Sequence, residues 1–98
     1  MSHIVWNCQG LGSNLTVRVL HGLIWKHRPF VVFLMETKMR DDRISSVRMR
    51  MGFIDNFNVP PVGSARGLSL WWDESVKVTI WRSSQNMIDT KVEIIQIG

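Results

Sequence analysis

The hydrophobic pattern at the start of the chain predicts two strands with a helix between them. Residues His3–Asn7 are rich in β-branched and aromatic side chains and end at a glycine-rich turn, which is typical of a strand. Residues 30–35 are apolar without alternation, as in a strand that is buried on both faces. Between them, apolar residues recur at helical spacing until a proline ends the pattern. That helix is marked by Val17, Leu20, Leu23 and Ile24, with Ser13 or Asn14 as N-cap and Pro29 as the stop.

The order strand, helix, strand with short connections predicts a βαβ unit. In such a unit the two strands lie parallel in one sheet, and their carboxyl ends meet at the same edge. Asn7 ends the first predicted strand, and Glu36 follows the second. We therefore expect these two side chains to emerge next to each other.

The remaining pattern predicts a second short helix and a strand-rich second half. Asp41 or Asp42 offers an N-cap for the helix and Gly52 a stop, with Ile44, Val47 and Met51 on the buried face. Segments 53–59 and 67–72 follow, separated by a turn-rich stretch. Alternation predicts a half-buried strand at 76–82, and residues 87–97 are expected to form one more.

The last predicted strand has no following element to cover its apolar face or to pair with its edge. A complete domain normally provides such an element. The pattern therefore predicts a truncated domain, which could self-associate through the exposed C-terminal strand edge.

Composition places the chain among small globular domains with a basic surface. Its 98 residues are 45% hydrophobic and 20% charged, which is enough for one domain at most. The formal net charge is +4 and the pI is near 10.0, which favours a polyanionic partner such as nucleic acid. A solvated basic surface explains the same charge, because the sequence has no long run of basic residues.

Cysteine usage and the apolar runs predict the compartment. Cys8 is the single cysteine, so the chain forms no internal disulfide, and no Cys/His group has zinc-ligand spacing. The longest strongly apolar run, residues 30–35, is too short to cross a bilayer, and the N-terminus lacks signal-peptide features. We expect an intracellular protein, nuclear or cytoplasmic, with no membrane partner.

Short sequence words on these elements resemble a known superfamily, the exonuclease-endonuclease-phosphatase (DNase I-like) proteins. The words are Ile-Val-Trp-Asn-Cys-Gln-Gly-Leu-Gly at 4–12, Arg-Pro at 28–29, Phe-Leu-Met-Glu-Thr-Lys at 33–38, Gly-Phe at 52–53 and Gly-Leu-Ser-Leu-Trp-Trp at 67–72. More narrowly, they look like the endonuclease domain of plant LINE-type non-LTR retrotransposons. The match follows the family in order and spacing over nearly the whole chain.

The resemblance implies a fold, an activity and a cofactor. The fold is a four-layer α/β sandwich, of which residues 1–98 would be a partial domain, roughly the N-terminal half, with a mixed sheet and two helices. The activity is the cleavage of phosphodiester bonds in DNA, in retroelements by nicking genomic DNA to prime reverse transcription. The cofactor is Mg²⁺ or Mn²⁺, and the partner is DNA.

The resemblance also assigns roles to three residues. Glu36 corresponds to the metal-binding, catalytic carboxylate, and carboxylates are the ligands that Mg²⁺ prefers. Asn7 corresponds to an active-site asparagine, whose amide can donate to a phosphate oxygen. Lys38 would offer a positive charge to the substrate backbone. Without the family, the same residues are explained as a solvated turn glutamate, an Asx turn into Gln9 and a surface lysine.

The sequence departs from the family pattern in ways that weaken a catalytic role. Gln9 stands where arginine is usual, Met35 where a small residue is common and Arg66 where glycine is expected. The later Asp-x-Asn and Ser-Asp-His words are missing from these 98 residues. The three histidines, His3, His21 and His27, lie outside the family motif and cannot replace its last residue.

Three hypotheses follow from this pattern. The first is a truncated, retroelement-derived endonuclease domain that is inactive as this chain. The second is a non-catalytic basic module that binds nucleic acid or another partner, and the third is an excerpt of a longer active polypeptide. A DNA-facing surface would draw on arginines that could equally be a solvated helix face: Arg40, Arg43, Arg48, Arg50 and Arg66.

Overall fold

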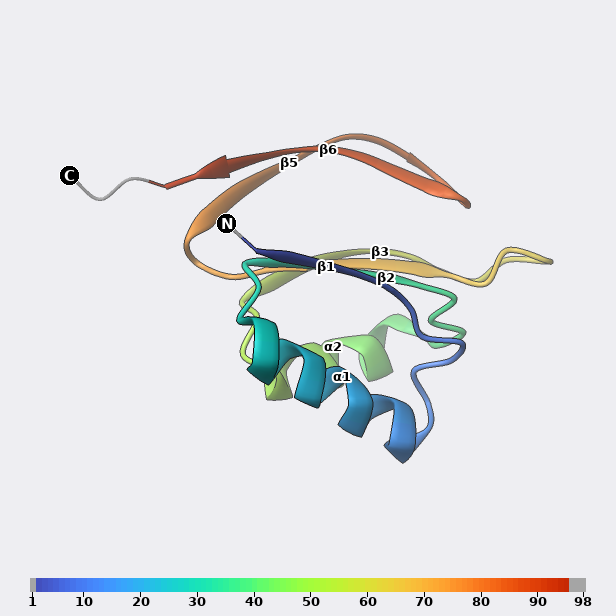
Figure 1. Cartoon of the computed structure of the whole chain (residues 1–98). Helices are drawn as coiled ribbons and strands as arrows, with labels where there is room; N and C mark the ends of the chain where they lie inside the picture. Colours follow the sequence, from blue (N-terminus) through green and yellow to red (C-terminus); the bar gives the residue numbers. More distant parts are fainter. Residues whose placement is uncertain (1, 96–98) are drawn as a thin grey trace.

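The computed structural model describes residues 2–95, which form a mixed α/β fold of two helices and two sheets. The helices are α1 (Asn14–His27) and α2 (Asp41–Arg50). The strands are β1 (His3–Asn7), β2 (Val31–Met35), β3 (Asp55–Val59), β4 (Leu68–Trp72), β5 (Val76–Ser84) and β6 (Met87–Ile94). Figure 1 shows three layers, with both helices on one face of the larger sheet and the β5–β6 hairpin over the other.

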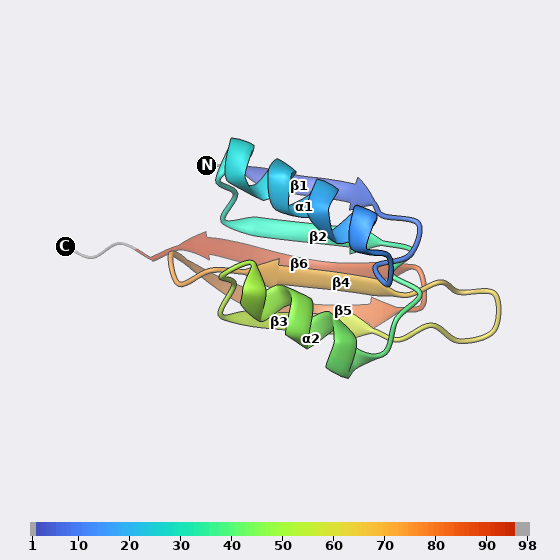
Figure 2. The same cartoon turned by 90° about the horizontal axis from the view of Figure 1, so that it is seen from below.

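The four-stranded sheet has the order β1-β2-β4-β3, and β5 pairs with β6 in a sheet of its own. β1 runs parallel to β2, whereas β4 is antiparallel to both of its neighbours. The helix α1 connects the two parallel strands and lies across them, as seen from the helix side in Figure 2. The βαβ unit predicted from the sequence is therefore confirmed.

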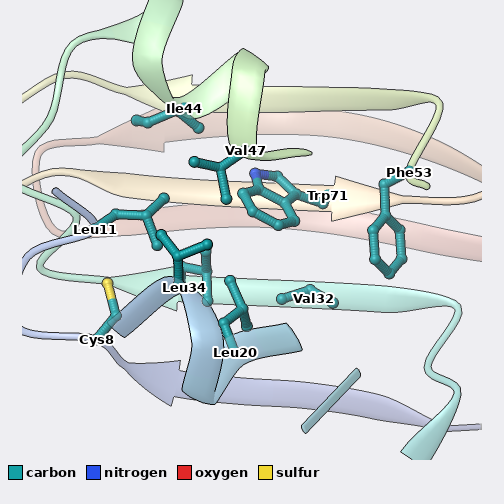
Figure 3. Packing of buried hydrophobic residues seen from close by; sticks show 10 residues of the cluster. Cys8, Leu11, Leu20, Val32, Leu34, Ile44, Val47, Phe53 and Trp71 are labelled. Carbon is teal, nitrogen blue, oxygen red and sulfur yellow. The ribbon is translucent and has the colours of Figure 1, made fainter. Parts of the chain in front are cut away.

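Alternation along the central strands produces two hydrophobic cores. Val32 and Leu34 of β2 and Trp71 of β4 point toward the helices, where they pack with Leu20 and Val47 (Figure 3). The intervening residues of the same strands point to the other face and pack against the hairpin. That second core is centred on Val31, Leu70 and Val76. The predicted burial of β2 on both faces follows from its central position between these layers.

A chain of hydrogen bonds between three side chains lies in the helix-side core. The indole Nε1 of Trp71 donates to Ser69 Oγ at 2.6 Å, and Ser69 Oγ donates to Asn58 Oδ1 at 2.5 Å. Ser69 and Trp71 are fully buried. The chain matters because a buried indole N–H without an acceptor would destabilise the fold.

The structure confirms the predicted N-cap of α1 and corrects that of α2. Ser13 caps α1, since its Oγ accepts from the backbone N–H of Thr16 at 3.3 Å. The prediction that Asp41 or Asp42 caps α2 is wrong, because the N-cap is Arg40 and both aspartates lie inside the first turn. There they still favour the positive end of the helix dipole.

Strand bounds also differ from the predictions. β2, β3 and β4 begin one or two residues later than predicted, at Val31, Asp55 and Leu68, and β5 extends beyond the predicted 76–82 to Ser84. The last strand ends at Ile94, so the prediction of a strand over 87–97 is wrong at Ile95, while Gln96 and Ile97 lie outside the described residues. Among residues 2–95, no helix combines the length and the apolar character needed to cross a membrane.

Candidate functional site

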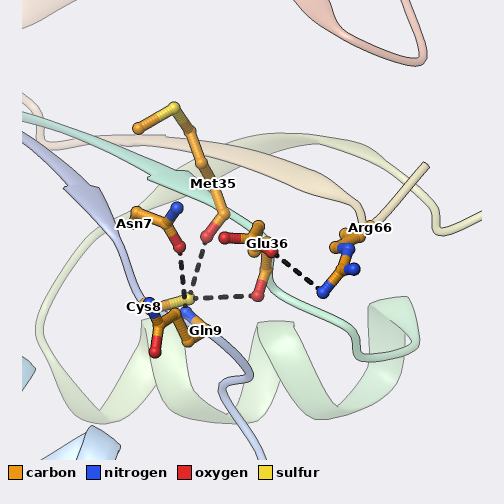
Figure 4. Close-up of polar contacts among 6 residues, drawn as sticks. All are labelled: Asn7, Cys8, Gln9, Met35, Glu36 and Arg66. Carbon is orange, nitrogen blue, oxygen red and sulfur yellow. Dashed lines mark hydrogen bonds and ion pairs between the residues drawn. The ribbon is translucent and has the colours of Figure 1, made fainter. Parts of the chain in front are cut away.

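The carboxyl ends of β1 and β2 bring the two predicted site residues together. Asn7 pairs with Met35 in the parallel ladder, and Glu36 follows directly (Figure 4). The ladder continues past the strands, because the N–H of Cys8 donates to Met35 O at 3.1 Å and that of Gly10 to Glu36 O at 2.7 Å. The sequence prediction that Asn7 and Glu36 share one sheet edge is confirmed.

Main-chain hydrogen bonds join three loops into one framework at this edge. The N–H of Leu11 donates to Thr37 O at 2.8 Å, which fixes the loop after β1 to the loop after β2. On its other side, the N–H of Lys38 donates to Arg66 O at 2.8 Å, and that of Thr37 to Gly67 O at 3.2 Å. The loop after β2 is thus held between two others, and its side chains have fixed starting points.

The framework contains three non-glycine residues in the left-handed region. Gln9 has φ 50°, Glu36 φ 55° and Lys38 φ 53°. Side chains at such positions cost about 1–2 kcal/mol relative to the right-handed region. Strain of this kind gathers at functional sites more often than elsewhere, and here it fixes the direction in which Glu36 leaves the sheet edge.

Glu36 makes an ion pair across the framework. Its Oε1 lies 3.2 Å from an Nη atom of Arg66, and its side chain is 27% exposed against 59% for Arg66. Both residues line an open hollow of about 320 Å³. The hairpin turn at Gln85 and Asn86 also contributes to its wall. The negative charge of Glu36 at the strand ends is therefore already balanced by the positive charge of Arg66.

Asn7 forms an Asx turn. Its Oδ1 accepts from the backbone N–H of Gln9 at 3.2 Å. This is the structural role that the sequence left open beside the catalytic one, and it helps to hold the left-handed residue Gln9. The carboxamide nitrogen of Asn7 is free of protein partners in the described part of the chain and could donate to an incoming oxygen.

Thr37 and Gly67 are the residues behind the site that sequence reasoning missed. Thr37 is fully buried, and its Oγ1 has no hydrogen-bond partner among the described residues. Gly67 has φ 92°, and a Cβ there would lie 2.5 Å from Thr37 Oγ1. Glycine is needed at this point because neither the backbone angle nor the space admits a side chain.

Cys8 lies beneath the two strand ends. Its Sγ donates to Met35 O at 3.2 Å and approaches Glu36 O at 3.6 Å. Burial raises the pKa of this thiol, and the charge of Glu36 raises it further, while backbone hydrogen bonds and Lys38 act in the opposite direction. The raised pKa keeps this group a neutral thiol at physiological pH, which is a weaker nucleophile than the thiolate.

Lys38 is exposed beside the strand ends, with its stem over Gly10. It lines two shallow hollows, one shared with Arg40 and Arg43 and the other with Arg66. These four basic side chains lie in the loops at the site and in the first turn of α2.

The two other arginines considered from the sequence lie elsewhere. Arg48 is not a surface residue of this kind, because its Nη1 donates to Phe53 O at 2.6 Å and its Nε is buried. Arg50 lines a groove between the two helices with Arg18 and His21.

The strand ends offer a divalent cation few free oxygen ligands. Mg²⁺ takes oxygen ligands, and Glu36 and Asn7 offer oxygens of the right type. One carboxylate oxygen is paired with Arg66, however, and the Asn7 oxygen accepts from Gln9. Within residues 2–95, no three His, Cys, Asp or Glu side chains are grouped to hold a metal ion. Because one Glu36 oxygen and the Asn7 oxygen are engaged by protein donors, the residues as placed do not fit a bound Mg²⁺ or Mn²⁺.

Comparison with known proteins adds no assignment, since neither a scan against protein-family models nor a search of curated proteins finds a match. The family resemblance rests on the motif residues alone. The Arg66 partnership of Glu36 was also missed from the sequence, where the departure from the family's glycine at that position was its one signal.

Proposed function

We propose that residues 1–98 carry the Asn7–Glu36 part of a retroelement-type DNA endonuclease site and do not cleave DNA by themselves. The observation that carries the proposal is the parallel pairing of β1 with β2, which puts Asn7 and Glu36 side by side at one sheet edge. The motif words at 4–12 and 33–38 support it, because they place the family's active-site residues at these two positions.

The layered fold is compatible with this proposal. A sheet with helices on one face and a second sheet on the other would correspond to three consecutive layers of a four-layer α/β sandwich. The helix layer, the β1-β2-β4-β3 sheet and the β5–β6 hairpin would form the N-terminal half of that DNase I-like domain. The fourth layer would be a helix layer on the outer face of the hairpin.

The absence of turnover follows from the chemistry of hydrolysis. Cleavage of a phosphodiester needs neutralisation of charge on the phosphoryl group and a residue that activates water. Glu36 is paired with Arg66, and the Asn7 oxygen accepts from Gln9, so both oxygen donors are already engaged. His3 lies at the opposite end of β1, while His21 and His27 lie on α1, so none of the three reaches the strand ends.

A plasmid-nicking assay tests the catalytic part of the proposal. Supercoiled DNA is incubated with the pure chain in Mg²⁺ and, separately, in Mn²⁺, beside a Glu36→Gln variant. We expect both proteins to leave the plasmid supercoiled to the same extent as buffer. Nicking by the wild-type chain that disappears in the variant would overturn the proposal.

Reading the transcript past the codon for Gly98 tests the ancestry at little cost. Asp-x-Asn and Ser-Asp-His words downstream, in frame, would show that the site is completed by further residues. Their presence would also favour an active longer polypeptide over an inactive one. An unrelated sequence downstream would leave the nicking result as the deciding measurement.

A second candidate function is non-catalytic binding of nucleic acid, and a specific grouping favours it. Lys38, Arg40, Arg43 and Arg66 line adjoining hollows at the strand ends. Contacts to DNA phosphates make affinity fall with salt, by a slope of about 0.9 per contact on logarithmic axes. Lys38→Gln should reduce affinity and slope, whereas Arg82→Gln on the hairpin should not. Absence of DNA binding at low salt would exclude this function.

A further inference from the structure

The pairing of Glu36 with Arg66 has a consequence for cation binding. A guanidinium carries a fixed positive charge and presents several N–H donors to a carboxylate. Here its Nη1 atom lies 3.2 Å from Oε1 of Glu36, one of the two oxygens with which this carboxylate could bind a metal ion. The Glu36 side chain is 27% exposed and that of Arg66 59%, so water screens this contact mainly from the side of the arginine.

The backbone under Arg66 is held in place, so the contact does not depend on a loose loop. Arg66 O accepts from Lys38 N–H at 2.8 Å, and the neighbouring Gly67 O accepts from Thr37 N–H at 3.2 Å. These two hydrogen bonds hold the backbone of Arg66 next to Thr37 and Lys38, the residues that follow Glu36. From this fixed position the side chain of Arg66 reaches the carboxylate of Glu36.

The charge balance at the site also opposes a divalent cation. Among residues 2–95, Glu36 is the one carboxylate that lines the hollow, and Arg66 neutralises it. Lys38 is close by and adds a further positive charge. A cation with two positive charges would therefore approach an edge that is already neutral or positive, whereas Mg²⁺ sites in proteins are acidic.

We propose that Arg66 is an internal counter-ion that occupies the cation position at Glu36 and keeps divalent metal ions out. This inference rests on the proposed function, because it takes Glu36 as the metal carboxylate of the site. It goes further by naming Arg66 as the residue that prevents metal binding at that carboxylate. Replacing Arg66 by a neutral residue should expose Glu36 to metal, without any other change in the framework.

The test measures binding of Mn²⁺ from the electron paramagnetic resonance signal of the free ion. The variants are Arg66→Gln, Arg66→Gly, which restores the family's residue, and Arg66→Lys, which keeps the charge. Arg82→Gln is the matched control, since it removes one arginine from an exposed pair with Asp89 at 3.3 Å on the hairpin. Circular dichroism verifies that each variant is folded.

We expect Arg66→Gln and Arg66→Gly to bind Mn²⁺ about five- to tenfold more tightly than the wild-type chain. Both variants lose the competing ion pair with Glu36 and the repulsion between the guanidinium and the metal ion. Arg66→Lys and Arg82→Gln should stay at the wild-type value. Adding Glu36→Gln to Arg66→Gln should abolish the gain. Two charge-removing variants keep the test decisive if one of them fails to fold.

Three results would overturn the counter-ion proposal, and the first two differ in what they say of the proposed function. Glu36-dependent binding by the wild-type chain, unchanged in the Arg66 variants, would leave Glu36 as a metal ligand and remove the role of Arg66. Absence of Glu36-dependent binding in every variant would remove both roles. A gain equal to that of Arg82→Gln would show a general charge effect and would also refute the proposal.

Discussion

Replacing Gly67 by alanine tests how the backbone framework of the site is built. The substitution meets two separate penalties, a backbone angle of φ 92° and a Cβ only 2.5 Å from Thr37 Oγ1. The angle costs about 1–2 kcal/mol for an alanine. Overpacking in a buried place costs about a further 1–3 kcal/mol. The expected loss in the free energy of unfolding is therefore about 2–5 kcal/mol.

The chain offers a matched control for each penalty. Gly52 has φ 88° but nothing within 4 Å of its Cβ position, so Gly52→Ala should cost only the angular part, about 1–2 kcal/mol. Adding Thr37→Ala to Gly67→Ala removes the clashing oxygen and should restore about 1–3 kcal/mol. The difference between the two glycine variants then measures the contact alone.

Urea unfolding followed by far-ultraviolet circular dichroism gives these free energies. In a thermal scan, a loss of 2 kcal/mol lowers the midpoint by at least about 8 °C for a domain of this size. A Gly67→Ala variant no less stable than Gly52→Ala would refute the steric part of the reasoning. Failure of Thr37→Ala to rescue it would show that the clash is relieved elsewhere in the loop.

Three further predictions concern the core, the thiol and the strained loop. Ser69→Ala removes the acceptor of the Trp71 indole and should cost about 1–3 kcal/mol in urea unfolding, while a Ser69→Ala change made in a Trp71→Phe background should cost clearly less. Burial raises the pKa of Cys8 in the folded chain, so the stability that its neutral thiol contributes is complete below the pKa of the unfolded chain and falls as the pH rises toward the pKa of the folded chain. Between about pH 8 and 10, a Cys8→Ala variant should therefore lose less stability than the wild-type chain. The same decrease of the free energy of unfolding with pH in both proteins would contradict this. Lys38→Gly relieves a left-handed residue at φ 53° and should raise the midpoint of unfolding by a few degrees, with no gain arguing against strain at that position.

The elements that the sequence predicted well are those with a strong local signal. Periodicity located α1, and the continuous apolar run located β2 with its two buried faces, because both patterns arise from packing that the residues themselves determine. The βαβ rule then placed Asn7 beside Glu36. The weakest boundary was the start of α2, where acidic residues that suit a helix cap also suit the first turn.

What the sequence did not predict depends on contacts between distant loops. Arg66 reaches Glu36 because residues 66 and 67 bond to residues 37 and 38, and no pattern within either segment encodes that pairing. The Thr37 hydroxyl, which has no partner in the described part of the chain, and the need for glycine at position 67 arise at the same junction. Local propensity is silent on such features because they are fixed by tertiary structure alone.

The main-chain bonding of the three loops separates the geometry of this site from its chemistry. The bonds that join Gly10, Leu11, Thr37 and Lys38 to neighbouring carbonyls involve no side-chain atom, so they survive most changes of residue type. One codon change at Arg66 can therefore alter the charge of the strand ends while the backbone stays where it is. In such a scaffold, single substitutions can remove or restore a function without unfolding the domain. The same property offers a protein engineer a fixed backbone on which new ligands can be installed one residue at a time.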